Sequence, residues 1–301
     1  MADKPSRALV VYGDGLARSV NPSHTHLHSL ASRACCGFLS LPHSPPSENE
    51  DARIIREFAE LLDSSEAYNT MNEKDSSEAG SQKTFIGPTI SERFAGMKSA
   101  IATNNSSLSA FCNHIGFTIL QPECVVRDNP HALALELLKL LGFQDGTASE
   151  TCQFDLVVLH VEEDGIEDVD GLLGELMKLA QPGTEVGSRL HLSVVLSFGN
   201  VSNDDHSRFS IADNRHESNS ELRMLYPRQS YTTKGGKPRE NVRHHCPMLV
   251  AQWQDGVTRK DEVGAFSFQD FKEDGGNLVI PADRFLHELT FKLWKAPKYG
   301  A

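Results

Sequence analysis

The chain has 301 residues, of which 39% are hydrophobic and 23% charged, and this length allows a substantial core in one large domain or two modest ones. Its formal net charge of −12 argues against a general nucleic-acid binder, because such a protein needs a basic face and the basic cluster Lys234, Lys237, Arg239 and Arg243 is only local. No apolar run approaches the roughly 20 residues of a membrane span, so we expect no such span.

The six cysteines form no CxxC pair and no spacing typical of a zinc ribbon. Several lie in apolar segments, where a free cysteine behaves as a small hydrophobe. We therefore expect reduced thiols, which suit an intracellular protein, and the opening sequence MADKPSRALVVYG lacks the apolar stretch of a signal peptide. These features favour a cytoplasmic location.

Five short apolar runs, rich in Val, Ile and Leu, predict strands that are covered on both faces. These runs are residues 8–12, 99–103, 154–161, 190–197 and 248–253. Segments with helical periodicity occur at 51–63, 129–142, 168–180 and 282–294. Strands that alternate with helices predict an α/β fold with a mostly parallel central sheet and helices on both faces, and we expect residues 1–301 to form a single domain of this class.

Two stretches interrupt the alternation of strands and helices. Residues 64–92 are rich in Ser, Glu and Gly and predict a mobile insertion. Residues 199–245 carry many charges and little periodicity, which predicts a long irregular loop or a cap over a cleft.

The strand at 8–12 runs into Gly13-Asp14-Gly15, and this acidic turn raises a question about function. Ligands of open α/β sheets gather beyond the carboxyl ends of the strands, where Asp14 is expected to lie. An aspartate between two glycines is also a good turn former. Both interpretations, a metal ligand and a tight turn, remain open at this point.

The order of these elements resembles the alkaline phosphatase superfamily and, within it, the cofactor-independent phosphoglycerate mutases. The sequence LVVYGDG is followed by THLHSLASRACCGFLSLP, then by PPSENEDARIIREF, FDLVVLHVEEDGIEDVDG, LHLSVVLSFGNVS and HHCPMLVAQW, in the order of that family's segments. The resemblance spans roughly residues 8–295. It implies an alkaline phosphatase-like α/β fold and phosphoryl transfer assisted by two metal ions.

The resemblance also implies roles for individual residues. Asp14 matches the first metal-binding aspartate, Ser47 the nucleophile and Asp164 the second metal-binding aspartate. The remaining candidate metal ligands are Asp168, which stands where a histidine is expected, His244 or His245 at the final histidine, and His206 beyond the strand at 190–197. An Asp-His pair should follow that strand, but Ser197-Phe198 stands there instead.

Each of these residues also has a structural interpretation. Ser47 opens a capping box with Glu50, although a helix N-terminus also favours a phosphate. Asp164 and Asp168 precede a helix whose dipole they would stabilise, and Asp168 could be its N-cap. His24, His26 and His28 alternate with other residues, and we interpret them as part of the surface or of a cleft rim.

The missing Asp-His pair removes an anionic ligand and an imidazole from the same expected ion. We therefore predict a catalytically degenerate relative that acts as a binding or interaction protein, its partner being a phosphorylated small molecule or another protein. One divalent ion, Mn²⁺, Mg²⁺ or Zn²⁺, held by Asp14 with Asp164 or Asp168, is compatible with this interpretation.

Two alternatives stay open. The first is an active metal-dependent phosphatase, phosphodiesterase or phosphomutase with rearranged ligands, since Asp14, Ser47 and Asp164 are retained. The second is a scaffold subunit of a larger complex that docks through the C-terminal sequence FKLWKAPKYGA, unless Trp294 packs on the core.

Overall fold

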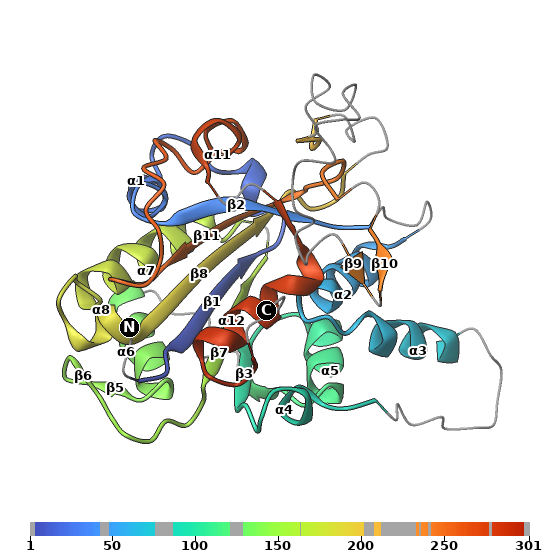
Figure 1. The fold of residues 1–301 in the computed structure, drawn as a ribbon, viewed down its shortest axis with the longest axis horizontal. Helices are drawn as coiled ribbons and strands as arrows, with labels where there is room; N and C mark the ends of the chain where they lie inside the picture. Colours follow the sequence, from blue (N-terminus) through green and yellow to red (C-terminus); the bar gives the residue numbers. More distant parts are fainter. Residues whose placement is uncertain are drawn as a thin grey trace.

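A computed structural model describes residues 4–42, 48–75, 87–120, 129–162, 164–201, 208–211, 233–234, 236–239, 242–276 and 279–297. Its centre is an eight-stranded sheet with the strand order β12-β2-β11-β8-β1-β7-β3-β4 (Figure 1). The strands are β1 Arg7–Gly13, β2 Cys35–Ser40, β3 Ser99–Ala102, β4 Thr118–Leu120, β7 Leu156–Val161, β8 Leu190–Ser197, β11 Met248–Trp253 and β12 Val279–Pro281. Two small hairpins pair β5 Phe143–Gln144 with β6 Thr147–Ala148, and β9 Thr233–Lys234 with β10 Lys237–Pro238.

The sheet is mostly parallel, as the sequence predicts. Strand β1 pairs in parallel with β7 on one side and β8 on the other. Within the eight-stranded sheet only β11 is antiparallel to its neighbours, and it lies between β8 and β2. All five predicted strands are confirmed, and β2, β4 and β12 complete the sheet.

Helices cover both faces of the sheet and divide the core into two hydrophobic clusters. One face carries α1 Thr25–Ala31, α6 Pro130–Leu140, α7 Ile166–Leu179, α8 Glu185–Arg189 and α11 Phe268–Asp274, with the 3₁₀ turn η1 Leu16–Arg18. The other carries α2 Glu50–Leu61, α3 Ser65–Asp75, α4 Ile90–Arg93, α5 Ser106–His114 and α12 Phe285–Lys292, with η5 Ala282–Arg284. None of the described helices is long and apolar enough to cross a membrane.

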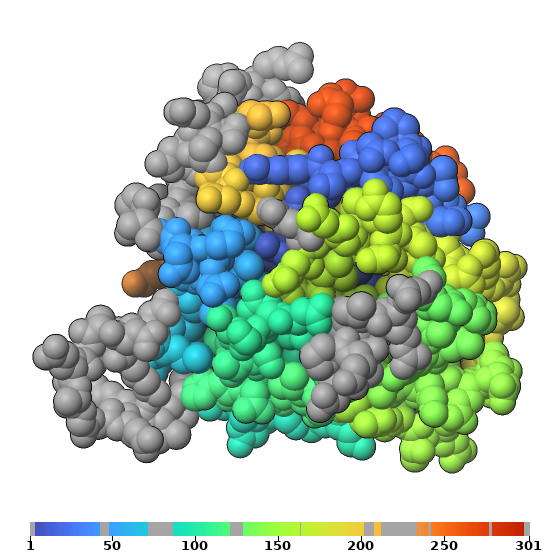
Figure 2. Space-filling view, turned by 180° about the vertical axis from the view of Figure 1, so that it is seen from behind, coloured from blue at the N-terminus to red at the C-terminus, as the bar shows by residue number. Residues whose placement is uncertain are grey.

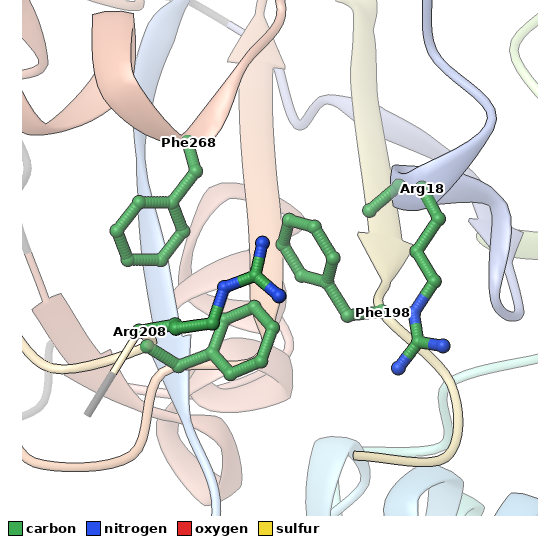
Figure 3. Close-up of a pocket in the computed structure, with 6 residues that line it drawn as sticks. Arg18, Phe198, Arg208 and Phe268 are labelled. Atoms are coloured by element: carbon green, nitrogen blue, oxygen red, sulfur yellow. The ribbon is translucent and has the colours of Figure 1, made fainter. Parts of the chain in front are cut away.

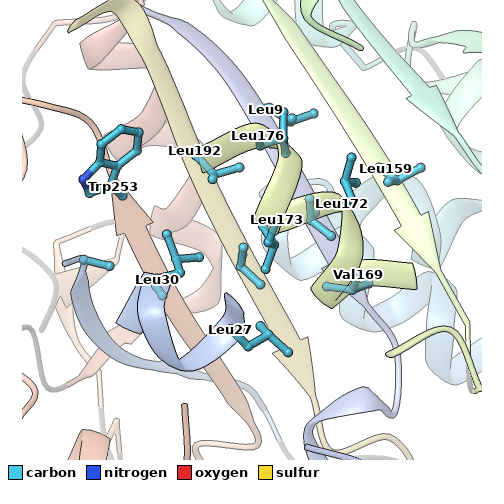
Figure 4. Packing of buried hydrophobic residues seen from close by; sticks show 14 of the residues in the cluster. Leu9, Leu27, Leu30, Leu159, Val169, Leu172, Leu173, Leu176, Leu192 and Trp253 are labelled. Atoms are coloured by element: carbon cyan, nitrogen blue, oxygen red, sulfur yellow. The ribbon is translucent and has the colours of Figure 1, made fainter. Parts of the chain in front are cut away.

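Strand β1, a single short apolar run, contributes side chains to both hydrophobic clusters. Successive side chains of a strand point to opposite faces, so Leu9 and Val11 belong to one cluster and Val10 and Tyr12 to the other. Figure 4 shows Leu9 and Leu192 of the sheet beneath leucines of α1 and α7, and Figure 2 shows these two helices side by side on the outer surface.

The helices confirm most of the sequence interpretation and correct two of its caps. Helix α6 begins at Pro130, and the Asn129 side chain accepts hydrogen bonds from two backbone amides of its first turn, as expected. Helix α2 is capped by Asn49, whose side chain accepts from Ala52 N, so the predicted capping box of Ser47 with Glu50 is wrong. Helix α7 begins at Ile166 after Gly165, which places Asp168 inside the first turn and excludes it as the N-cap.

The two irregular stretches are described only in part. Helix α3 lies within residues 64–92, helix α4 begins there and ends at Arg93, and residues 76–86 are outside the described part of the chain. Within 199–245 the description covers 199–201, 208–211, the β9–β10 hairpin with Arg239, and 242–245. The predictions of a mobile insertion and of a cap remain predictions.

The carboxyl edge of the parallel strands brings several segments together. Gly13 ends β1, and the next backbone amide, of Asp14, donates to the carbonyl of Val161 at the end of β7, at 2.8 Å. Because β11 runs in the opposite direction, its first residue, Met248, pairs with Ser197, the last residue of β8. The segment that precedes β11, with His244 and His245, therefore lies at the same edge as Asp14.

Candidate functional site

The Gly13-Asp14-Gly15 turn is fixed by close packing. A Cβ atom on Gly13 would lie 2.6 Å from Cδ2 of Leu196 and 2.8 Å from Cδ1 of Leu16, closer than real side chains approach. Gly15 has a φ of 70°, a left-handed conformation that favours glycine. Gly13 is thus favoured by side-chain packing and Gly15 by its backbone conformation, and the turn holds the Asp14 carboxylate at the carboxyl edge.

The carboxylate of Asp14 is engaged by side chains of two other elements. The Arg53 guanidinium, from α2, donates from Nη1 to Oδ1 at 2.9 Å and from Nη2 to Oδ2 at 2.6 Å. The Ser197 hydroxyl, from the end of β8, donates to Oδ1 at 3.0 Å. Asp14 is 2% exposed and Arg53 4%, so this two-bond ion pair lies inside the protein.

Ser197 links the β1 turn to the end of β8. Its Oγ accepts hydrogen bonds from Gly15 N at 2.9 Å and Gly199 N at 3.1 Å while donating to Asp14. One hydroxyl therefore satisfies two buried backbone donors and one carboxylate oxygen. The sequence interpretation noted Ser197 only as the residue that replaces an expected aspartate.

Further carboxylates surround the two arginines of α2. Arg53 also donates to Glu57 Oε2 at 3.1 Å and pairs with Glu50, while Nε of Arg56 donates to Glu48 at 2.8 Å. Burial raises the pKa of Glu57 to about 7, and the guanidinium of Arg53 opposes that rise. With this pKa, Glu57 changes charge near neutral pH.

Tyr12 directly precedes the Gly13-Asp14-Gly15 turn in the chain and packs against two further rings. The Tyr12 ring is 5.5 Å from the Phe58 ring and stacks at 5.5 Å on the His160 ring. His160 shares a 2.8 Å hydrogen bond between Nδ1 and Thr103 Oγ1, and its buried Nε2 has no hydrogen-bond partner among the described residues. Burial lowers the pKa of His160 and raises that of Tyr12, so both side chains are neutral at physiological pH.

A pocket of about 450 Å³ opens beside the Asp14 network at the same edge of the sheet. Three of its lining residues follow closely after β1 or β8, so the pocket is adjacent to the Gly15 turn and to Ser197. Its lining combines three aromatic and two cationic side chains with one small residue: Ala17, Arg18, Phe198, Arg208, Phe209 and Phe268 (Figure 3).

The residues predicted to bind metal lie in different environments. Asp164 is exposed, with a φ of 78°, and Asp168 is exposed in the first turn of α7. His245 is 5% exposed and its carbonyl accepts from Leu41 N at 3.1 Å, whereas His244 is half-buried. The candidates Ser47 and His206 lie outside the described residues.

Within the described ranges, no three His, Cys, Asp or Glu side chains gather as a metal site would require. Asp14 itself has its charge compensated by Arg53 and three of its roughly four lone-pair positions occupied by hydrogen bonds. This donor set does not fit a divalent cation on Asp14. The metal roles assigned from the sequence stay predictions.

The histidines near α1 have structural partners. His24 accepts from Asn21 N at 3.0 Å through Nδ1, and His28 bonds the Asn21 carbonyl at 3.0 Å through Nε2. Nδ1 of His28 also accepts from Phe266 N at 3.0 Å. The hydrogen bonds of these two imidazoles connect helix α1 to the loop that precedes it and to the segment before α11.

No family model matches this chain, and no curated protein matches it either. Solved structures do. The PH0037 protein from Pyrococcus horikoshii is similar over 99% of both chains, with a TM-score of 0.55 and 14% identity. The cofactor-independent phosphoglycerate mutase from Thermoplasma acidophilum is similar over 96% of this chain and 100% of its own, with a TM-score of 0.49 and 10% identity.

A third similar structure is a protein of the alkaline phosphatase superfamily from Vibrio parahaemolyticus, over 86% of this chain and 62% of its own, with a TM-score of 0.42 and 9% identity. The chain therefore has the α/β fold with a mostly parallel central sheet that its sequence predicts, and it shares this fold with the PH0037 protein. These likenesses concern the fold and assign no activity.

Proposed function

We propose that this protein is a non-catalytic binding or interaction protein built on an alkaline phosphatase-like fold. The observation that carries the proposal is the buried pair of Asp14 and Arg53, in which a guanidinium takes the position on the carboxylate that a metal cation would need. The hydroxyl of Ser197 supports it, because it donates to Asp14 where the resemblance leads one to expect a further metal-binding aspartate.

Electrostatics explain why the guanidinium and a divalent ion are alternatives. An arginine keeps its charge at every physiological pH. Two unit charges 4 Å apart repel by about 4 kcal/mol at an effective dielectric constant of 20, and a divalent ion would double that cost. Moving Arg53 away from Asp14 would also break its ion pairs with Glu57 and Glu50. The fold would thus retain its architecture without the metal ions on which phosphoryl transfer in the resembled family depends.

The proposal is tested by metal content and turnover measured on the same preparation. The full chain is purified without chelator, and Mn, Zn and Mg are quantified for the natural protein and for Asp14→Asn. Hydrolysis of p-nitrophenyl phosphate is then measured with each metal added. We expect the two proteins to carry the same background metal and to show no turnover.

A stoichiometric metal that is lost in Asp14→Asn, together with hydrolysis lost in Ser47→Ala, would overturn the proposal. It would establish instead a metal-dependent phosphatase, phosphodiesterase or phosphomutase whose ligands rearrange around Asp14. Exposed Asp145→Asn is the matched control for the loss of one aspartate charge, and it should change neither quantity.

A second role, docking into a larger complex, is favoured by the end of α12. Trp294 is 60% exposed and Phe291 41%, so the alternative in which Trp294 packs on the core is wrong. We propose that these two rings contact a protein partner. If so, Trp294→Ala should reduce the apparent size of the protein on size exclusion of cell extract, whereas Leu135→Ala, which removes another exposed hydrophobic side chain, should not.

A further inference from the structure

We propose that the pocket beside Asp14 binds a small molecule that joins an aromatic ring to an anionic group. This inference rests on the proposed function in that it names the class of ligand for a binding protein. The pocket is formed by side chains other than those of the Asp14 network, so occupancy and catalysis can be measured separately.

The aromatic part of the site is a cluster of three phenylalanines from three segments. The Phe198 ring centroid lies 4.6 Å from that of Phe209 and 6.2 Å from that of Phe268, and the last two are 5.8 Å apart. Phe198 and Phe268 are half-buried, so part of each ring faces the pocket. All three pairs are tilted or edge-on, with interplanar angles of 50° to 74°, which leaves ring faces for a ligand to stack on.

The cationic part comes from Arg18 of η1 and Arg208, which are both exposed. Figure 3 shows the guanidinium of Arg208 between the rings of Phe198 and Phe268, and Arg18 on the other side of Phe198. Arg18 donates through Nη2 to the carbonyl of Asn200, which fixes its direction and leaves other N–H donors of the same group. None of the described lining residues is acidic, although the chain as a whole has a net charge of −12.

This combination selects one ligand chemistry. Three ring faces favour a flat apolar group, and two guanidinium groups favour a carboxylate, sulfonate or phosphate with which they form charge-assisted hydrogen bonds. A volume of about 450 Å³ lies within the roughly 300–1,000 Å³ of small-molecule sites. A purely apolar ligand would make no charge-assisted hydrogen bond with these arginines, and a bare anion would not stack on the rings.

Two matched probes separate the ring from the charge. 8-Anilino-1-naphthalenesulfonate carries an anionic group on an aromatic system, and N-phenyl-1-naphthylamine carries the same rings without the sulfonate. Fluorescence titration of the full chain, after metal quantification, gives the stoichiometry and dissociation constant for each. Inorganic phosphate, as an anion without a ring, is the third probe and is added as a competitor.

We expect the sulfonate probe to bind at one site per chain, more tightly than the uncharged probe, with weak competition by inorganic phosphate. Arg208→Gln and Arg18→Gln should each weaken the sulfonate probe by about tenfold, the loss typical of one charge-assisted contact, and should change the uncharged probe less than twofold. Phe268→Leu should weaken both probes. Arg33→Gln, at an exposed arginine outside the pocket lining, should weaken neither.

The inference is overturned if both pocket arginine variants bind the sulfonate probe like the natural protein, if Arg33→Gln weakens it equally, or if the uncharged probe binds as tightly. Unchanged thermal midpoints establish that the variants are folded, and Phe198→Leu replaces Phe268→Leu if the latter unfolds. If the protein is inert and metal-free but fails to bind the sulfonate probe, the proposed pocket ligand is refuted and the proposed non-catalytic function is not. A metal-dependent esterase that binds the probe through Arg208 refutes only the proposed function.

Discussion

Arginines are used in two opposite ways at the carboxyl edge of this sheet. Arg53 is buried, and its bonds go to carboxylates of the protein itself, Asp14, Glu50 and Glu57. Arg18 and Arg208 are exposed beside phenylalanines and line a pocket without acids among its described residues. Position relative to the strand ends therefore does not decide function, because the same residue type stabilises the fold in one region and lines an exposed pocket in the other.

The largest effect is expected for Arg53→Met. The substitution leaves the carboxylate of Asp14 buried without its cation and removes one of the two arginines that pair with Glu57, and removing one partner of a buried ion pair costs about 3–5 kcal/mol. Urea unfolding measures this loss in the free energy of unfolding. The double variant Arg53→Met/Asp14→Asn should recover a large part of it, since it also removes a buried charge.

Arg33→Met serves as the control, because Arg33 is exposed, and it should change the free energy of unfolding by less than about 0.5 kcal/mol. If Arg53→Met were as mild as this control, the contrast between a buried structural arginine and exposed arginines would not hold.

The next effect concerns the pH dependence caused by Glu57. Its pKa is about 7 in the folded protein and about 4.5 in the unfolded chain, so the folded state binds more protons between these values. The contribution of Glu57 to stability therefore falls as pH rises from about 4.5 to 7 and is constant above that. Glu57→Gln removes this fall and should stabilise the protein at pH 8 by no more than about 3 kcal/mol.

Urea unfolding of both proteins at pH 5, 6, 7 and 8 checks the sign. The exposed Glu66→Gln is the matched control and should run parallel to the natural protein. A Glu57→Gln curve that also stays parallel would mean that Glu57 is ionised throughout this range and that the buried network carries one more negative charge.

A smaller effect is expected for Ser197→Ala. The change removes the acceptor of the Gly15 and Gly199 amides and one donor to Asp14, which should cost about 1–3 kcal/mol of unfolding free energy. Ser193→Ala, in the same strand, loses only a 3.3 Å bond from Gln252 and should cost less. Equal losses would show that the hydroxyl of Ser197 does not join β1 to β8 as strongly as its geometry indicates.

The smallest effect is expected for Arg18→Gln. Arg18 is exposed, and its described bond is to the carbonyl of Asn200, so its loss should change the thermal midpoint by no more than about 2 °C. Scanning calorimetry measures the midpoint. A larger decrease would place Arg18 with Arg53 among the structural arginines and would weaken the case for its role in binding.

The fold was largely predictable because its strands and helices depend on local patterns. The apolar runs that became β1, β7 and β8 are buried on both faces, and nothing in them competes with a strand. Strand β2 was less clear, since the sequence CCGFLS is short and contains a glycine. The N-cap of α2 was misplaced because Ser47 and Asn49 are both good caps, and only the structure shows that the Asn49 side chain accepts the amide.

The site was predictable only at Asp14. The partner of its carboxylate comes from α2, and Arg53 looked like one of several charged residues in an amphipathic helix. The sequence holds only a weak signal: Arg53, Arg56 and Glu57 share one face of the helix, as charged residues on a solvated face also do. Ser197 could not be recognised, because a hydroxyl that bonds two amides across a turn depends on the register between β1 and β8.

The reversed direction of β11 has a consequence for how this protein can change. Strands β8 and β11 are joined as the two arms of one hairpin, closed at its base by a 2.9 Å bond from Phe198 N to the Pro247 carbonyl. Everything between these two residues leaves and re-enters the sheet at one point. The insert can therefore change in length without shifting any strand of the sheet, while the residues by which it joins the core, such as Ile211 and Cys246, have to be kept.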